Sequence, residues 1–89
     1  MTDRDLIPLQ DVAAGNLLFH TGRWGGPAGY RWCGPDGEEA GQVPGWEEVQ
    51  LDRLRTLGLI AIETRRGPFD RKVTVTAQGL AELHLAQAA

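Results

Sequence analysis

The second half of the chain changes from a helical to a strand period at a single residue, Gly58. Before this glycine, side chains recur at helical spacing after a Pro-Gly start, namely Trp46, Val49, Gln50, Leu54 and Leu57. After it, residues 59–64 are aliphatic and β-branched, and residues 72–76 alternate polar and apolar beyond a turn at 65–71. A glycine that ends a helical period, followed by two strand-like runs around a turn, predicts a helix at 46–57 and then a β-hairpin.

Two further helices are predicted, one on each side of this region. The first covers roughly residues 8–15, where Pro8 suits a first-turn position and Gly15 suits a helix end. The second covers about residues 77–87, because Thr76 is a good N-cap and leucines follow at helical spacing. These helices flank the rest of the chain.

The segment between the first two predicted helices contains turn signals and no helical period. Residues 17–21 and 29–33 are typical of short strands, so an N-terminal hairpin is possible there. The Gly-Pro-Asp-Gly run at 34–37 predicts a turn. The expected order is helix, possible hairpin, helix, hairpin, helix, which is a small α+β fold.

The length and composition limit the domain count and the compartment. Eighty-nine residues suffice for one core, so we expect a single domain over 1–89. No apolar run approaches ~18 residues, so a membrane span is not expected. The residues after Met1 are acidic and lack an apolar segment, which predicts a cytoplasmic protein without a secretory signal. The single Cys33 excludes an intramolecular disulfide framework and a cysteine-based zinc cage.

The second half of the chain resembles a known family. The run Asp-Arg-Leu-Arg-Thr-Leu-Gly-Leu-Ile at 52–60 is followed by a basic turn and then by Val-Thr-Val-Thr-Ala-Gln-Gly-Leu at 73–80. In this order and spacing, residues 44–87 resemble the back half of bacterial winged-helix domains of the MarR and PadR type. The resemblance implies a winged-helix-like fold, with residues 46–57 as recognition helix and the following hairpin as wing. The family has a further helix before the recognition helix, where this chain has no helical period at 22–43.

Charge is distributed unevenly along the chain. Residues 1–48 carry three arginines against eight acids, a net of −5, and residues 49–89 carry six bases against four acids, a net of +2. A basic region is where a polyanion would bind. The resemblance places Arg65, Arg66, Arg71 and Lys72 on the phosphate backbone of duplex DNA. It places Gln50, Arg53 and Arg55 in or near the major groove.

The sequence gives little support for catalysis or for a cofactor. It contains no serine, and Cys33 has no evident activating base. The spacing of His20, His84 and Cys33 matches no short metal-binding signature, so we expect structural roles and no metal or other cofactor. The tryptophans and Tyr30 are expected in the core or at a dimer contact, with Trp32 and Trp46 packed together. We therefore predict a non-enzymatic binding protein.

The predicted function is duplex DNA binding by a small transcriptional regulator or an accessory factor of phage or plasmid type. One such domain has a small footprint, so a homodimer through the terminal helix or helix 8–15 is expected. The alternative is a winged-helix module that binds another protein without binding DNA. The acidic first half, with Glu47 and Glu48 at the start of the recognition helix, favours this alternative.

Overall fold

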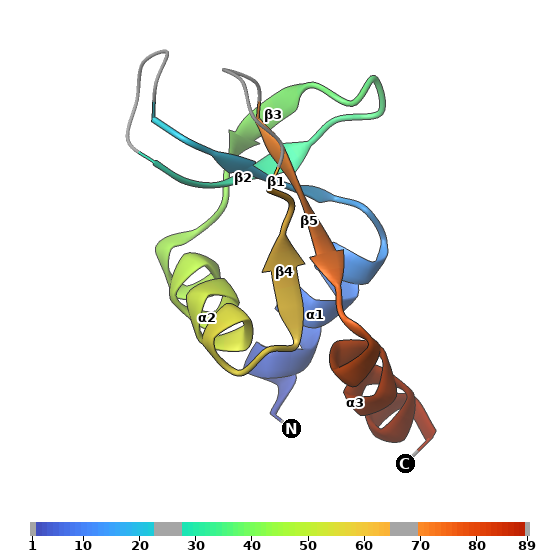
Figure 1. The fold of residues 1–89 in the computed structure, drawn as a ribbon. Coiled ribbons are helices and arrows are strands. Elements are labelled where there is room, and N and C mark those ends of the chain that lie inside the picture. The colour runs from blue at the N-terminus through green and yellow to red at the C-terminus, as the bar shows by residue number, and fades with distance from the viewer. Residues whose placement is uncertain (1, 23–27, 65–69, 89) are drawn as a thin grey trace.

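A computed structural model describes residues 2–22, 28–64 and 70–88 of the chain, and within these ranges it is an α+β fold (Figure 1). The elements are, in order, α1 (Asp3–Ala13), β1 (Leu17–His20), β2 (Gly29–Cys33), β3 (Glu39–Gln42), α2 (Gly45–Thr56), β4 (Ile60–Ile62), β5 (Arg71–Val75) and α3 (Ala77–Ala88). The described part thus contains three helices and five strands.

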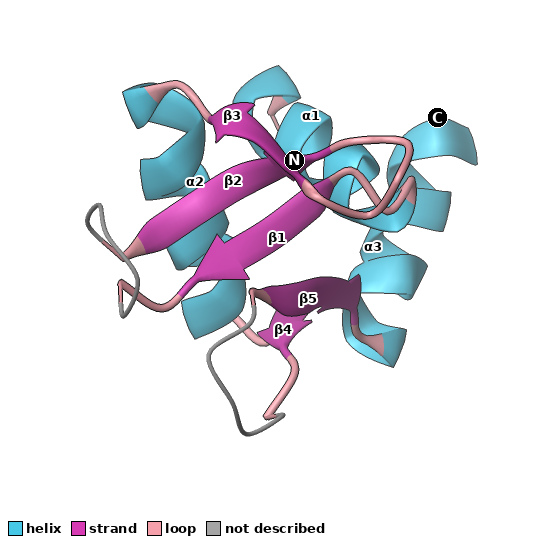
Figure 2. Cartoon of the chain, turned by 90° about the horizontal axis from the view of Figure 1, so that it is seen from above, coloured by secondary structure: helices cyan, strands magenta, loops and turns pink. Residues whose placement is uncertain are grey.

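All five strands belong to one antiparallel sheet with the order β3-β2-β1-β5-β4. The predicted N-terminal hairpin is confirmed, because β1 pairs with β2 from Leu17 opposite Trp32 to His20 opposite Gly29. The second hairpin is also confirmed, with Ile60 opposite Val75 in the β4–β5 pair. Pairing of β1 with β5 joins the two hairpins, and Figure 2 shows α1 and α2 behind the sheet formed by β1 and β2.

The edge strand β3 was not predicted. Its sequence, Glu-Ala-Gly-Gln, has no apolar alternation, and all four residues are exposed. Pairing of Arg31 with Gln42 and of Cys33 with Glu39 holds this strand against β2. Since backbone pairing and not side-chain burial places it, periodicity gives no signal for it.

The predicted boundaries of the first helix are wrong. Helix α1 begins at Asp3 instead of residue 8, so Pro8 lies inside the helix and is buried. The Thr2 carbonyl accepts the N–H groups of Asp5 and Leu6, which provides the first turn without Pro8. The proline costs one helical hydrogen bond, to the carbonyl of Arg4. Burial of its ring against the core offsets part of that loss.

Helix α2 begins and ends one residue before the predicted bounds, and part of its predicted apolar stripe faces solvent. The buried residues of this helix are Glu47, Leu51 and Leu54, whereas Val49 is 67% exposed and Leu57, just after the helix, is 51% exposed. Gly58 has a φ of +77°, which confirms it as the residue that lets the chain leave the helix. The helix packs against α1, β2 and β4, and these three contacts select its buried face.

Helix α3 begins as predicted, and its start is tied to the end of α2. The Thr76 hydroxyl accepts the N–H of Gly79 at 3.0 Å and donates to the carbonyl of Gly58 at 2.6 Å. A side chain at position 79 would collide with the backbone of Leu59, so only glycine fits this approach. The core between the sheet and the helices consists of Leu9, Val12, Leu17, Tyr30, Val43, Leu51, Leu54, Leu59, Ile60, Val73 and Leu83.

No helix in the described ranges is both long and apolar enough to cross a membrane.

Candidate nucleic-acid interface

The outer face of α2 is the surface that the sequence predicts to contact DNA. Val49, Arg53 and Leu57 follow one another at i, i+4 and i+8, which places them in one stripe facing solvent. Trp46, at the start of the helix, is also exposed, and the guanidinium of Arg4 lies 5.7 Å from its ring centroid. The core position expected for Trp46 is therefore wrong, and the alternative, a dimer contact, stays a prediction. The stripe combines apolar groups with cations.

Glu47 does not belong to this outer face. Its side chain is turned toward α1, and the residue is only 3% exposed. Burial, a hydrogen bond with Asp11 and the charge of Asp11 together raise the pKa of Glu47 from 4.5 to about 7. Near pH 7 the Glu47 carboxyl group is consequently protonated and neutral in a substantial fraction of the molecules.

The remaining two acids of α2 are held by β2. Glu48 Oε1 accepts the backbone N–H of Tyr30 at 3.3 Å, and Asp52 Oδ1 accepts its hydroxyl at 3.2 Å. Burial, followed by the charge of Asp52, raises the pKa of Tyr30 well above its usual range. The Tyr30 ring also packs edge-on against Phe19, with centroids 5.3 Å apart. The tyrosine thus fixes the orientation of α2 on the sheet.

Gln50 and Arg53 lie at the junction between α2 and α1. Gln50 Nε2 and an Arg53 guanidinium nitrogen both donate to Asp5 Oδ1 at 2.9 Å. The other oxygen, Asp5 Oδ2, accepts the hydroxyl of Thr2 at 3.0 Å. Arg55 is exposed but lies about 140° around the helix from Gln50. The three predicted groove-contacting side chains therefore do not share one face.

The predicted wing residues are only partly described. Arg65 and Arg66 lie outside the described residues. Arg71 and Lys72 are consecutive in β5 and so point to opposite sides of the sheet. Lys72 is exposed, whereas Arg71 is half-buried and its Nε atom is buried with no hydrogen-bond partner.

A second group of polar residues gathers where β1 ends and β5 begins. His20 Nδ1 lies 2.9 Å from Asp70 Oδ1 and 3.6 Å from Glu39 Oε2. Arg31, which is buried, places its Nε 3.5 Å from Glu39 Oε1. Sequence reasoning considered His20 only with His84 and Cys33 and missed this group. No local spacing signals it, because its members come from four separate positions in the sheet.

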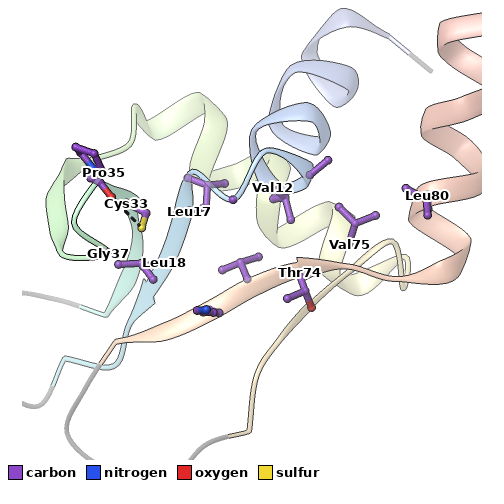
Figure 3. Close-up of a pocket in the computed structure, with 14 residues that line it drawn as sticks. Val12, Leu17, Leu18, Cys33, Pro35, Gly37, Thr74, Val75 and Leu80 are labelled. Carbon is purple, nitrogen blue, oxygen red and sulfur yellow. Dashed lines mark hydrogen bonds between the residues drawn. The ribbon is translucent and has the colours of Figure 1, made fainter.

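An apolar groove of about 610 Å³ lies between the end of α1, the β1–β5 pair and α3 (Figure 3). Val12, Leu17, Val75 and Leu80 contribute apolar side chains to its wall. Cys33 is also in this wall, and its sulfur lies 3.5 Å from the carbonyl oxygen of Gly34. Among the described residues of this lining, Cys33 is the one thiol, and none is a histidine or a carboxylate.

Comparison with protein-family models, with curated proteins and with solved structures found no match for this chain.

Proposed function

We propose that this protein binds duplex DNA as a winged-helix-like module, using the outer face of α2 and the β4–β5 hairpin. The order of elements supports the proposal, because this hairpin directly follows α2, as a wing follows a recognition helix. In place of the family's second helix, the chain has the β2–β3 hairpin. Tyr30 of that hairpin holds α2 through Glu48 and Asp52.

The observation that carries the proposal is the orientation of the acids of α2. Glu47 is buried against α1, and Glu48 and Asp52 are bonded to Tyr30. Carboxylates at the start of a recognition helix would repel phosphates if they pointed outward. The acids are thus held by α1 and β2, whereas the outward stripe presents Val49 and Arg53, whose side chain is 57% exposed while it bonds Asp5.

The test is a titration of a short random-sequence duplex by fluorescence anisotropy, at low and at moderate salt. Phosphate contacts release counterions, so a plot of the logarithm of the binding constant against the logarithm of the salt concentration should be a falling line. Its slope should be about −0.9 for each phosphate contact. Absence of binding at low salt by the folded protein would contradict the proposal.

The contribution of the wing is tested by replacing Arg65, Arg66 and Arg71 together with alanine. We expect weaker binding and a shallower salt slope, since backbone contacts are lost. The matched control makes the same change in net charge at exposed residues outside α2, the wing and α3, through Gln10→Glu, Asn16→Asp and Gln42→Glu. If the wing variant and the control bind DNA equally, the wing has no specific role.

A second candidate is a protein-binding module, and the exposed apolar side chains of α2 favour it. Trp46, Val49 and Leu57 lie on the outer side of the helix with Arg53. Tryptophan and arginine are the residues most enriched at the energetic centres of protein interfaces. Failure of DNA binding at low salt, in a protein shown to be folded, would select this candidate.

The proposal includes a homodimer formed through α3. Leu80 and Leu85 are exposed on this helix, although Leu83 is buried against the core. Exposed leucines on a terminal helix are costly to leave in water, and a second copy of the helix would cover them. A dimer would also double the small footprint of one module on DNA.

A further inference from the structure

One histidine and two carboxylates meet at one end of the sheet. His20 is the last residue of β1, Glu39 is the first residue of β3, and Asp70 immediately precedes β5. One nitrogen or oxygen atom from each residue lies within 4.8 Å of the other two. The strand order β3-β2-β1-β5 brings these three distant positions together.

We propose that His20, Glu39 and Asp70 bind a divalent transition-metal ion, for which Zn²⁺ is the representative. Imidazole nitrogen and carboxylate oxygen are both zinc ligands, with bonds of about 2.0–2.2 Å. Around a tetrahedral ion, bonds of that length separate the ligand atoms by about 3.3 Å. The distances from His20 Nδ1 to Asp70 and to Glu39, 2.9 and 3.6 Å, lie on either side of this value. The third separation, between the Glu39 and Asp70 oxygens, is within 4.8 Å, so side-chain rotations can bring all three atoms around an ion.

The Glu39 carboxylate already has the orientation that this site requires. Its Oε1 atom lies 3.5 Å from Arg31 Nε, and its other oxygen, Oε2, faces His20. The Arg31 side chain is itself fixed, because it is buried and donates to the carbonyl of Tyr30 at 3.0 Å. A fixed partner behind a ligand holds the orientation of that ligand.

The site is sheltered but can be reached from solvent. The side chains of His20 and Asp70 are 14% and 19% exposed, and that of Glu39 is 39% exposed. An ion can therefore enter on the side of Glu39, with water completing the coordination. The ion requires the lone pair of Nδ1, so it replaces the present His20–Asp70 hydrogen bond and leaves any ring proton on Nε2.

Metal binding at this site would link three separate parts of the sheet. An ion that binds only the folded chain raises the free energy of unfolding. Once the metal concentration exceeds Kd, this gain grows with the logarithm of the concentration. The inference does not rest on the proposed DNA binding, since its ligand is a metal ion, although Asp70 lies in the hairpin that the proposed DNA binding uses.

The test is calorimetric titration of the untagged full chain with ZnCl₂. We expect one ion per chain, with at least ~10-fold weaker binding in His20→Ala, Glu39→Gln and Asp70→Asn. His84→Ala is the matched control, because His84 is an exposed histidine on α3 that the site does not use. It should bind zinc as the original chain does.

Two readouts keep the proposal falsifiable even if a variant folds poorly. Glu39 lies on an exposed edge strand, so Glu39→Gln should remain folded by circular dichroism. Zinc should raise the Tm of the original chain and leave that of Glu39→Gln nearly unchanged. The proposal is overturned if the folded chain binds no zinc, if Glu39→Gln retains full affinity, or if His84→Ala loses as much affinity as His20→Ala.

Discussion

The carboxyl group of Glu47 occupies an environment that favours its neutral form. Its Oε2 atom is buried with no hydrogen-bond partner, and Asp11 lies beside it on α1. An ionised carboxylate would lose its hydration there and face a second acid. Its position in the first turn of α2 matches the helix dipole, so the sequence gives no reason to expect burial.

This raised pKa predicts a pH-dependent stability. Between about pH 4.5 and 7 the folded state keeps the Glu47 proton whereas the unfolded state has released it. The unfolding free energy contributed by Glu47 therefore falls as pH rises through this window and is constant above it. Glu47→Gln should remove this slope and stabilise the protein near pH 8 by about 1–3 kcal/mol.

Urea denaturation at about pH 5 and about pH 8 measures the effect. Glu38→Gln, an exposed acid in the turn before β3, is the control and should leave the slope unchanged. If Glu47→Gln shows the same pH dependence as the original chain, Glu47 is not the titrating group.

At the scale of elements, α2 shows how neighbouring elements select which face of a helix is buried. The sequence predicts a stripe with Trp46, Val49 and Leu57, yet the helix buries Leu51 and Glu47. Leucine and valine both suit a core, so the identities of the residues do not decide between the faces. The Asp5 bonds to Gln50 and Arg53 and the Tyr30 bonds to Glu48 and Asp52 set the rotation of the helix.

A pair of truncations on α2 tests this rotation. Leu51→Ala should lower the unfolding free energy by about 2–5 kcal/mol, because it leaves a cavity in the core. Val49→Ala should change it by less than about 0.5 kcal/mol, because Val49 is exposed in the monomer. Denaturant titration at low protein concentration measures both, and a larger loss for Val49→Ala would contradict the orientation of α2.

At the scale of the whole molecule, pairing of β1 with β5 joins two hairpins that are far apart in the sequence. Leu18 pairs with Lys72 and Phe19 with Arg71, so the first and second halves share one sheet and one core. The packing of α1 against α2 also brings an acid of the N-terminal half, Asp5, to a base of the second half, Arg53. The charge division along the sequence is therefore partly cancelled in space.

The proposed dimer predicts that a charge on α3 changes the mass in solution. Leu85 is 68% exposed, so Leu85→Glu should leave the fold intact and prevent a second α3 from packing against it. Size exclusion with light scattering should give twice 9.7 kDa for the original chain and 9.7 kDa for the variant. Gln42→Glu makes the same change in net charge on the exposed strand β3, away from α3, and should remain dimeric. A monomeric original chain would contradict the dimer.

The elements with local signals can be predicted from the sequence alone. Gly58 ends α2 because a glycine has no Cβ that would oppose a φ of +77°. Thr76 starts α3 because its hydroxyl accepts the N–H of Gly79 in the first turn. The alternating runs around residues 65–71 likewise predicted the β4–β5 hairpin. Only the tertiary structure decided which face of α2 is buried, where β3 pairs, and that His20 meets Glu39 and Asp70. Those outcomes depend on contacts between residues distant in the chain, and no local period encodes such contacts.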